Sequence, residues 1–445
     1  MNLLGNAVFW GITVMLCLAT LRMNVVISLL AGAIAAGFCA GFSISETLFI
    51  FNGGLRSGAA IAVSYSLLGA FACALAHSGL AARLLGSMLH FLDGNAGQSN
   101  FRRRSGLLLL LLAIALLSKS FLPVHVAFIP ILLPPLLAPM ARIGLDRRAV
   151  ACTLAFGLVA SYLILPIGFG HIFLREILQE NLRSNGLSVS LGTILGALAI
   201  PFFGMGLGLL VAVFLSYGRP RSYGMGKILQ LPLQQHPAPG RRQFFSACIA
   251  LAVAATVQLG LGNSMVTGML AGMLVFWISG AISSEKIDGI VGEGIRMMAV
   301  IGIIMVTASG FAAVLKASGG IEQLVALMVR SVHGSRSMAA LLMLAIGFLI
   351  SVGIGSSFAT VPIVAALYVP FCAAVGFSPA ATVVLVAMAA VPGDPASPAS
   401  SSTLGPTSGL SADGQFNHMV DCVIPSFLHN SLPAIFFAWI AAMIL

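Results

Sequence analysis

Charged residues are scarce in this chain. Asp, Glu, Lys and Arg together make up 8% of its 445 residues, against roughly 25% in soluble domains. Hydrophobic residues make up 59%, and apolar runs of about 18–25 residues recur along the sequence, each long enough to cross a bilayer. This combination excludes a water-soluble globular protein and indicates an all-α polytopic membrane protein.

Cysteine and the common catalytic motifs are also missing or sparse. The seven cysteines are odd in number and occur singly in apolar segments, which argues against a disulfide framework or a thiolate metal site. The sequence contains no Walker loop, dinucleotide fingerprint, HExxH motif or nucleophile elbow. The unbroken apolar runs also lack the alternation of a transmembrane β-barrel. We therefore expect neither an enzyme nor a bound cofactor.

Basic residues outnumber acidic ones, and the formal net charge is +10. The Lys and Arg residues cluster between the apolar runs, which indicates membrane topology and a lipid-bilayer partner rather than a nucleic-acid partner. Counting sides from the N-terminus places most of them on one face, including Arg102–Arg104, Arg147 and Arg148. By the positive-inside rule that face is cytoplasmic, which predicts a cell (inner) membrane protein with both termini outside.

An internal repeat divides the chain into halves, residues 1–217 and 243–445, joined by a cytoplasmic linker, 218–242. Leu30, Gly32, Gly54 and Arg56 recur 240 residues later as Leu270, Gly272, Gly294 and Arg296. Pro130, Gly144, Pro166 and Pro201 recur 232 residues later as Pro362, Gly376, Pro398 and Pro433. Matching glycines and prolines are informative because each demands a particular backbone conformation. Such repeats are typical of secondary transporters.

In each half, the apolar runs and their interruptions predict about five spans plus a re-entrant helical hairpin and a broken helix. The first-half segments are 4–21, 25–42, 57–77, the hairpin 106–142, a break at 165–170 and a closing span 190–216. The second-half segments are 243–261, 264–281, 297–316, the hairpin 338–375, a break at 392–403 and a closing span 419–445. A short charged connector precedes the third span of each half, and each hairpin could instead be two short spans. Because five crossings is an odd number, we expect two inverted repeats.

The break at 392–403 is the strongest candidate for a site. Helices are interrupted at membrane depth only where the freed backbone groups are buried in protein or line a watered cavity. Asp394 is the acidic residue on the edge of a long apolar span, and ionisable residues there are usually functional. Hydroxyl groups surround it in sequence. We predict an ion site, with Na+ hypothesised at Asp394, formed by Asp394, Ser397, Ser400, Ser401 and Thr403 and completed from the hairpin tip by Ser356, Ser357 and Thr360. The alternative is a solvent-exposed loop rich in Ser, Pro and Gly.

The first half carries basic groups at the corresponding positions, and the partner of Asp394 in the repeat is Tyr162. We predict that the substrate-binding residues there are Ser118, His125, Gly168, Gly170 and His171. His125 could bind a carboxylate or relay a proton, or it could be an ordinary interior histidine. Lys119 could extend to the outer surface. Asn417, Asp421 and His429 could form a second relay, or Asp421 could be solvated at a span end.

Four segments carry a resemblance to a known family: 123–135, 145–152, 165–170 and Gly393–Pro398. With them the chain resembles the NhaC-like Na+/H+ antiporters of the ion transporter superfamily and, among these, the YuiF-type proteins proposed to be amino-acid permeases. The last segment is similar to the antiporters' Gly-Asp-Pro-x-Ser-Pro signature. It continues as Ala399-Ser400-Ser401-Ser402-Thr403, without the second acidic residue found there. The resemblance implies alternating access by movement of the hairpins and broken helices.

Two functions are compatible with these observations. The first is a cation-coupled secondary transporter that exchanges Na+ for H+. The second is a Na+- or H+-coupled permease for an amino acid such as histidine, favoured by the missing second carboxylate. A small half-helix channel is a further alternative. The sequence leaves open the solute and whether the protein forms a homodimer.

Overall fold

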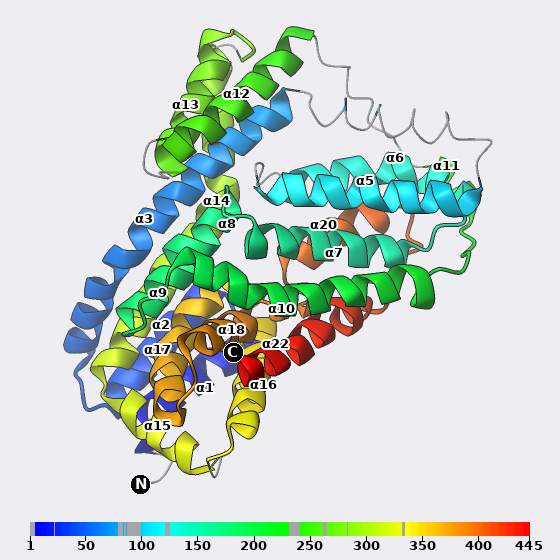
Figure 1. The fold of residues 1–445 in the computed structure, drawn as a ribbon. Coiled ribbons are helices and arrows are strands. Elements are labelled where there is room, and N and C mark those ends of the chain that lie inside the picture. The colour runs from blue at the N-terminus through cyan, green and yellow to red at the C-terminus, as the bar shows by residue number, and fades with distance from the viewer. Residues whose placement is uncertain are drawn as a thin grey trace.

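The computed structural model describes residues 5–21, 23–78, 83, 86, 99–120, 125–230, 241–260, 265–282, 284–331 and 334–445. Every regular element in these ranges is a helix (Figure 1), which confirms the predicted all-α class. Among the described residues, six helical segments are long and apolar enough to cross a bilayer: Arg147–Ile164, Leu191–Ser216, Arg336–Ile354, Ser357–Val375, Pro379–Leu410 and His418–Ile444.

The helices fall into two series, one for each half of the chain. The first is α1 (Ala7–Thr20), α2 (Val25–Cys39), α3 (Ile44–His77), α5 (Asn100–Ser120), α6 (His125–Arg142), α7 (Arg147–Ile164), α8 (Phe169–His171), the π-helix η2 (Ile172–Gln179), α9 (Glu180–Ser184), α10 (Leu191–Leu210) and η3 (Val211–Ser216). The second is α12 (Arg241–Gly260), α13 (Met265–Ile278), α14 (Ser284–Ala317), α15 (Gly320–Ser331), α16 (Arg336–Ile354), α17 (Ser357–Val375), α18 (Pro379–Ala390), α19 (Gly393–Ala396), α20 (Ser401–Leu410), η4 (His418–Val423), α21 (Ile424–Ser426), η5 (Phe427–Ser431) and α22 (Leu432–Ile444). The short α11 (Met225–Leu229) lies between them. The inverted orientation of the two series, and the domain boundaries, stay predictions.

The third span of each half is longer than predicted. Both α3 and α14 are continuous helices of 34 residues, and the charged connector expected before residues 57 and 297 is instead helical. At the start of α3, the Glu46 amide donates to the Ser43 hydroxyl and the Ser43 amide donates back to the Glu46 carboxylate. This capping box starts the helix at residue 44, so the charged residues lie on the helix and not on a connector.

The helices α3 and α14 pack against each other along one side of the molecule (Figure 1). Their backbones approach closely at Gly69 and Gly294, where a Cβ built on Gly69 would lie 2.2 Å from the Gly294 carbonyl oxygen. Small residues at such crossings are typical of membrane helices, because packing rather than exclusion of water drives their association. Beside this pair, α5, α6, α7, α20 and α10 are stacked (Figure 1).

The centre of the protein is formed by α7, α17 and the α18–α20 segment. In an apolar 18-residue window of each of these spans 89%, 78% and 94% of the residues are buried, against 39–44% in the windows of the other three. Helices that are apolar on all sides belong inside a bundle. The central position matters because both predicted helix breaks adjoin these segments.

A buried ion pair fixes the start of α7 to the turn after α20. Both Arg147 and Asp413 have fully buried side chains, and the guanidinium donates two hydrogen bonds of 2.7 Å to the carboxylate. Arg147 also donates to the Leu410 carbonyl at 3.1 Å and lies over the Tyr223 ring. Burial by itself raises the pKa of Asp413, but hydrogen bonds from Arg147 and Gln415 outweigh it and hold the pKa below its usual value.

We expect Asp413→Asn to lower the free energy of unfolding by about 3–5 kcal/mol, because it leaves the buried Arg147 charge unpaired. Arg183→Gln is the matched control, since its pair with Glu180 is exposed and should contribute about 0–1 kcal/mol. Thermal unfolding of the purified protein in detergent measures both. The folded-state pKa of Asp413 is lowered, so its stabilisation is complete above the ordinary pKa of an aspartate and is lost as the pH falls through the lowered value. Equal melting temperatures for the two variants would contradict this assignment.

Candidate ion and substrate site

The break in the second half is produced by proline. Ser397 precedes Pro398 and has an extended backbone, with φ −88° and ψ 132°, as the proline ring requires of the residue before it. Leu165, which precedes Pro166, has nearly the same conformation, with φ −90° and ψ 109°. Past the second break, the Ser400 hydroxyl accepts a hydrogen bond from the Ser402 amide and starts α20. Matching prolines therefore break the helix at both positions.

Side chains donate hydrogen bonds to four carbonyl groups around this break. The Pro392 carbonyl accepts a hydrogen bond of 2.6 Å from the Ser431 hydroxyl, and the Ala390 carbonyl accepts one from Ser351. Thr403 donates to the Ser397 carbonyl at 2.6 Å. The Pro398 carbonyl lies 2.9 Å from His418 Nε2, which therefore carries the hydrogen. These bonds allow an irregular backbone inside an apolar protein.

The break is buried, so the alternative of a solvent-exposed loop is wrong for most of this segment. All four residues of α19 are buried, and Ser397, Ser400, Ser402 and Thr403 are 0% exposed. Pro398 and Ala399 are exposed in the turn between α19 and α20. The serines are therefore interior groups that hold the backbone and the Asp394 side chain in place.

Asp394 lies at the centre of a cluster of polar groups. Its side chain is 5% exposed. One carboxylate oxygen accepts hydrogen bonds from the hydroxyls of Ser400 and Ser402, the latter at 3.0 Å. The other accepts a bond of 3.0 Å from the Tyr162 hydroxyl and lies 3.7 Å from Lys119 Nζ. Three hydroxyls and one ammonium group thus surround the carboxylate, which satisfies a buried ionised aspartate.

Lys119 is part of this cluster and does not extend to the outer surface. Its side chain is 3% exposed, its ammonium lies 4.6 Å from the centre of the Tyr162 ring, and it donates to the Ser402 hydroxyl at 3.5 Å. Lys119 belongs to the last turn of α5. The helix preceding the first hairpin tip therefore supplies the positive charge and the second broken helix the negative one.

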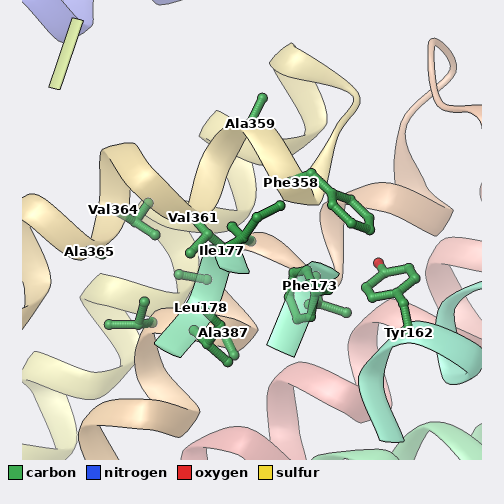
Figure 2. Packing of buried hydrophobic residues seen from close by; sticks show 14 of the residues in the cluster. Tyr162, Phe173, Ile177, Leu178, Phe358, Ala359, Val361, Val364, Ala365 and Ala387 are labelled. Carbon is green, nitrogen blue, oxygen red and sulfur yellow. The ribbon is translucent and has the colours of Figure 1, made fainter. Parts of the chain in front are cut away.

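An aromatic cluster holds Tyr162 in place. The Tyr162 ring packs against Phe173 of η2 and Phe358 of α17, with centroid distances of 4.9 and 5.1 Å. Figure 2 shows the three rings close together near the start of α17. Rings in these tilted geometries attract one another. Because the hydroxyl donates its single hydrogen to Asp394, the Ser357 hydroxyl, 3.0 Å away, donates to Tyr162.

The second hairpin tip reaches the cluster through Ser357. Gly355 ends α16 with a left-handed backbone, φ 73°, and Ser356 caps α17 through the Ala359 amide. The Ser397 hydroxyl donates to the Val352 carbonyl at 2.8 Å, which ties the hairpin to the broken helix. Of the three predicted tip residues, Ser357 contacts Tyr162, whereas Thr360 donates to the Ser356 carbonyl.

The predicted ligands therefore fall into two groups. Ser400 contacts Asp394 directly, and Ser357 contacts it through Tyr162. Ser397, Thr403, Ser356 and Thr360 serve the surrounding backbone, and Ser401 is half-buried at the first position of α20. An ion bound at Asp394 by this full set of residues stays a prediction.

The predicted first-half residues are less closely associated with Asp394. The side chains of Ser118 and His125 lie outside the described residues. His171 is buried, and its Nε2 lies 3.9 Å from a Glu176 carboxylate oxygen. The two glycines have steric roles: Gly168 has a φ of 59°, and a Cβ on Gly170 would lie 1.7 Å from the Leu165 carbonyl oxygen. In the described part of the chain, neither Gly168, Gly170 nor His171 forms a hydrogen bond with the Asp394 cluster.

Sequence reasoning missed the roles of Tyr162 and Ser402 and left the position of Lys119 open. A signal for Tyr162 existed, since it corresponds to Asp394 in the repeat, and the pair now proves to be in direct contact. Nothing in the sequence distinguishes Ser402 from its neighbouring serines. In the last span, Asp421 accepts a hydrogen bond of 2.9 Å from the Asn417 backbone amide and pairs with Arg221 at 3.0 Å. His429 is separate, with its Nε2 2.8 Å from the Ser216 hydroxyl. Asn417, Asp421 and His429 do not form the suggested relay.

A buried carboxylate beside a lysine, where a helix breaks inside an apolar bundle, is typical of secondary active membrane transporters. The sequence profile of the Na+/H+ antiporter family matches residues 153–439, and that of a second Na+-H+ antiporter family matches residues 6–92. A membrane protein of Vibrio parahaemolyticus is 46% identical over 99% of this chain and all of its own. YuiF of Bacillus subtilis, whose description proposes amino acid transport, is 42% identical over 99% of this chain and all of its own.

Among solved structures, the YdaH transporter of Alcanivorax borkumensis has a similar fold, with a TM-score of 0.60 and 16% identity over 89% of this chain and 87% of that one. The chain belongs to the Na+/H+ antiporter family. The resemblance predicted from the sequence is therefore confirmed, as is the prediction that the protein is a transporter and not an enzyme.

We expect Gly393→Ala to distort the site. A Cβ at Gly393 would lie 2.3 Å from the Ser351 hydroxyl oxygen, so the substitution displaces the residue next to Asp394 at a cost of about 1–3 kcal/mol. The control is Gly289→Ala on the exposed face of α14, where a Cβ meets nothing within 4 Å and should stabilise the helix by about 0.5–1 kcal/mol. Thermal unfolding and transport assays of both variants measure this. A fully active, equally stable Gly393→Ala protein would show that the close packing is unimportant.

Proposed function

We propose that the protein is a cation-coupled secondary transporter and that Asp394 binds the coupling cation. The observation that carries this proposal is the environment of Asp394: a carboxylate buried at a helix break, held by hydroxyls, with a lysine ammonium as its charged partner. The ammonium indicates that the site accepts one positive charge at this position.

The other buried aspartates support this choice by contrast. Asp146 is paired with Arg148 at 2.7 Å, Asp413 with Arg147 at 2.7 Å, and Asp421 with Arg221 at 3.0 Å. An arginine remains charged in proteins and holds a carboxylate through a rigid fork of donors, so these pairs are structural. Asp394 is paired with a lysine instead, at the longer distance of 3.7 Å. Of the four aspartates, Asp394 is therefore the one that can most easily exchange its partner for another cation.

Na+ and H+ are the cations to consider. Na+ is coordinated in transporters by side-chain and unwound backbone oxygens, and Asp394, Ser400, Ser402 and Tyr162 place four such groups together. Lys119 would have to move aside for Na+, because its ammonium occupies the position next to the carboxylate. The family description supports Na+ and H+ equally.

A second candidate function is uptake of an amino acid coupled to one of these cations. One observation favours it: the 42% identity over 99% of this chain to YuiF, whose description proposes amino acid transport. Vesicles containing the purified protein separate the two functions. A Na+ gradient that changes the internal pH without added solute supports exchange, whereas amino-acid uptake driven by a Na+ or H+ gradient supports the permease.

We expect Asp394→Asn to abolish cation-coupled flux, because asparagine keeps the shape of the side chain and removes the charge that attracts the cation. Expression should stay near the wild-type level, because Lys119, unlike Arg147, can release its proton when it loses its partner. Asp288→Asn, on the exposed face of α14, is the control and should transport normally. Flux in vesicles under an imposed Na+ or H+ gradient is the measurement. Undiminished coupling in Asp394→Asn would reject the assignment.

A further inference from the structure

Lys119 is held loosely for a buried charge. Its ammonium lies 3.7 Å from Asp394 and 3.5 Å from the Ser402 hydroxyl, whereas direct charge-assisted hydrogen bonds are about 2.7–2.9 Å long. The Arg147–Asp413 pair of the same protein makes two bonds of 2.7 Å. The Arg147–Asp413 pair is thus a tight ion pair with direct hydrogen bonds. The Lys119–Asp394 pair is longer and easier to separate.

Charge accounting shows what happens when a cation binds. Without it, Asp394 and Lys119 neutralise each other. Once a cation takes the place of the ammonium at Asp394, the lysine remains as an uncompensated positive charge inside the protein, which is strongly unfavourable. Among the described residues of this cluster, Asp394 and Lys119 are the charged ones. The hydroxyl groups beside them come from Tyr162, Ser357, Ser400 and Ser402. The uncompensated charge can be removed in two ways: Lys119 releases its proton, which amounts to exchange of the cation for H+, or a negative charge enters from outside.

We propose that Lys119 binds the carboxylate of the transported solute, which it is free to do only when the coupling cation occupies Asp394. This inference rests on the proposed function of Asp394. The cation and the solute carboxylate then bind together, because their charges cancel, and neither binds stably without the other. A lysine is a compact charge on a flexible stem, so it can turn from Asp394 to a solute nearby. The solute class is a small molecule with one free carboxylate, such as an amino acid.

The experiment uses the full-length protein in lipid vesicles. Uptake of each common L-amino acid is measured under Na+ and H+ gradients, with the corresponding amino-acid amide as competitor. The variants are Lys119→Gln, Lys119→Arg and the control Lys316→Gln, whose ammonium is exposed and donates to the Ser184 carbonyl. Thermal unfolding in detergent confirms that each variant is folded.

We expect the amide to compete at least about tenfold more weakly than the acid, because it lacks the charge that Lys119 binds. Lys119→Gln should lose solute uptake and gain a cation flux without solute, since its site is neutral once the cation alone is bound. Lys119→Arg should recover part of the uptake, and Lys316→Gln should equal the wild type. A lysine with only a structural role would give no solute-free cation flux.

Three results would overturn the inference: equal competition by amide and acid, unchanged uptake by Lys119→Gln, or Asp394-dependent cation flux with no carboxylate-bearing solute among the substrates. Because the competition assay uses the wild-type protein, it remains decisive if Lys119→Gln fails to fold. Failure of the proposed function is recognised separately, by cation coupling that persists in Asp394→Asn.

Discussion

A carboxylate inside an apolar bundle has to be neutralised by the protein itself, and the surroundings of Asp394 follow from that constraint. Ser400 and Ser402 at the start of α20, Tyr162 of α7 and Lys119 of α5 all direct hydrogen atoms to it. Elements from both halves of the chain thus meet at one side chain. Their relative positions are held by the need to satisfy that charge, because an unpaired carboxylate there would cost several kcal/mol.

The broken backbone obeys the same constraint. Several carbonyls that the helix releases near residue 394 accept hydrogen bonds from other elements, including Ser351 of α16, Ser431 of η5 and His418 of η4. The backbone at the break is therefore held by hydrogen bonds from other elements. These bonds link the hairpin, the broken helix and the last span. Movement of any one of these elements would change the hydrogen bonds around Asp394, which is how a bound cation could be coupled to a conformational change.

Much of the fold could be predicted because its signals are local. Apolar runs predict spans, and a proline before the break forces the preceding residue, Ser397, into an extended conformation. The extra length of α3 also has a local signal, the Ser43–Glu46 capping box, which the sequence analysis did not use. The partners of Asp394 were harder to predict. Ser400 is six residues away, but Lys119 and Tyr162 are distant in sequence, and a lysine near a span end has the same local pattern whether it faces lipid headgroups or the interior.

By itself, the sequence determined that this is an all-helical membrane protein of the Na+/H+ antiporter family, where its helices break, and that Asp394 is the acidic residue at a break. Only the tertiary structure decided which charge neutralises Asp394, that Tyr162 and Ser357 connect it to the hairpin tip, and that Asp146, Asp413 and Asp421 are paired with arginines. The reason is physical: hydrophobicity and proline act on neighbouring residues along the chain, whereas a buried charge is compensated by whichever groups the packing of distant helices brings within a few ångströms.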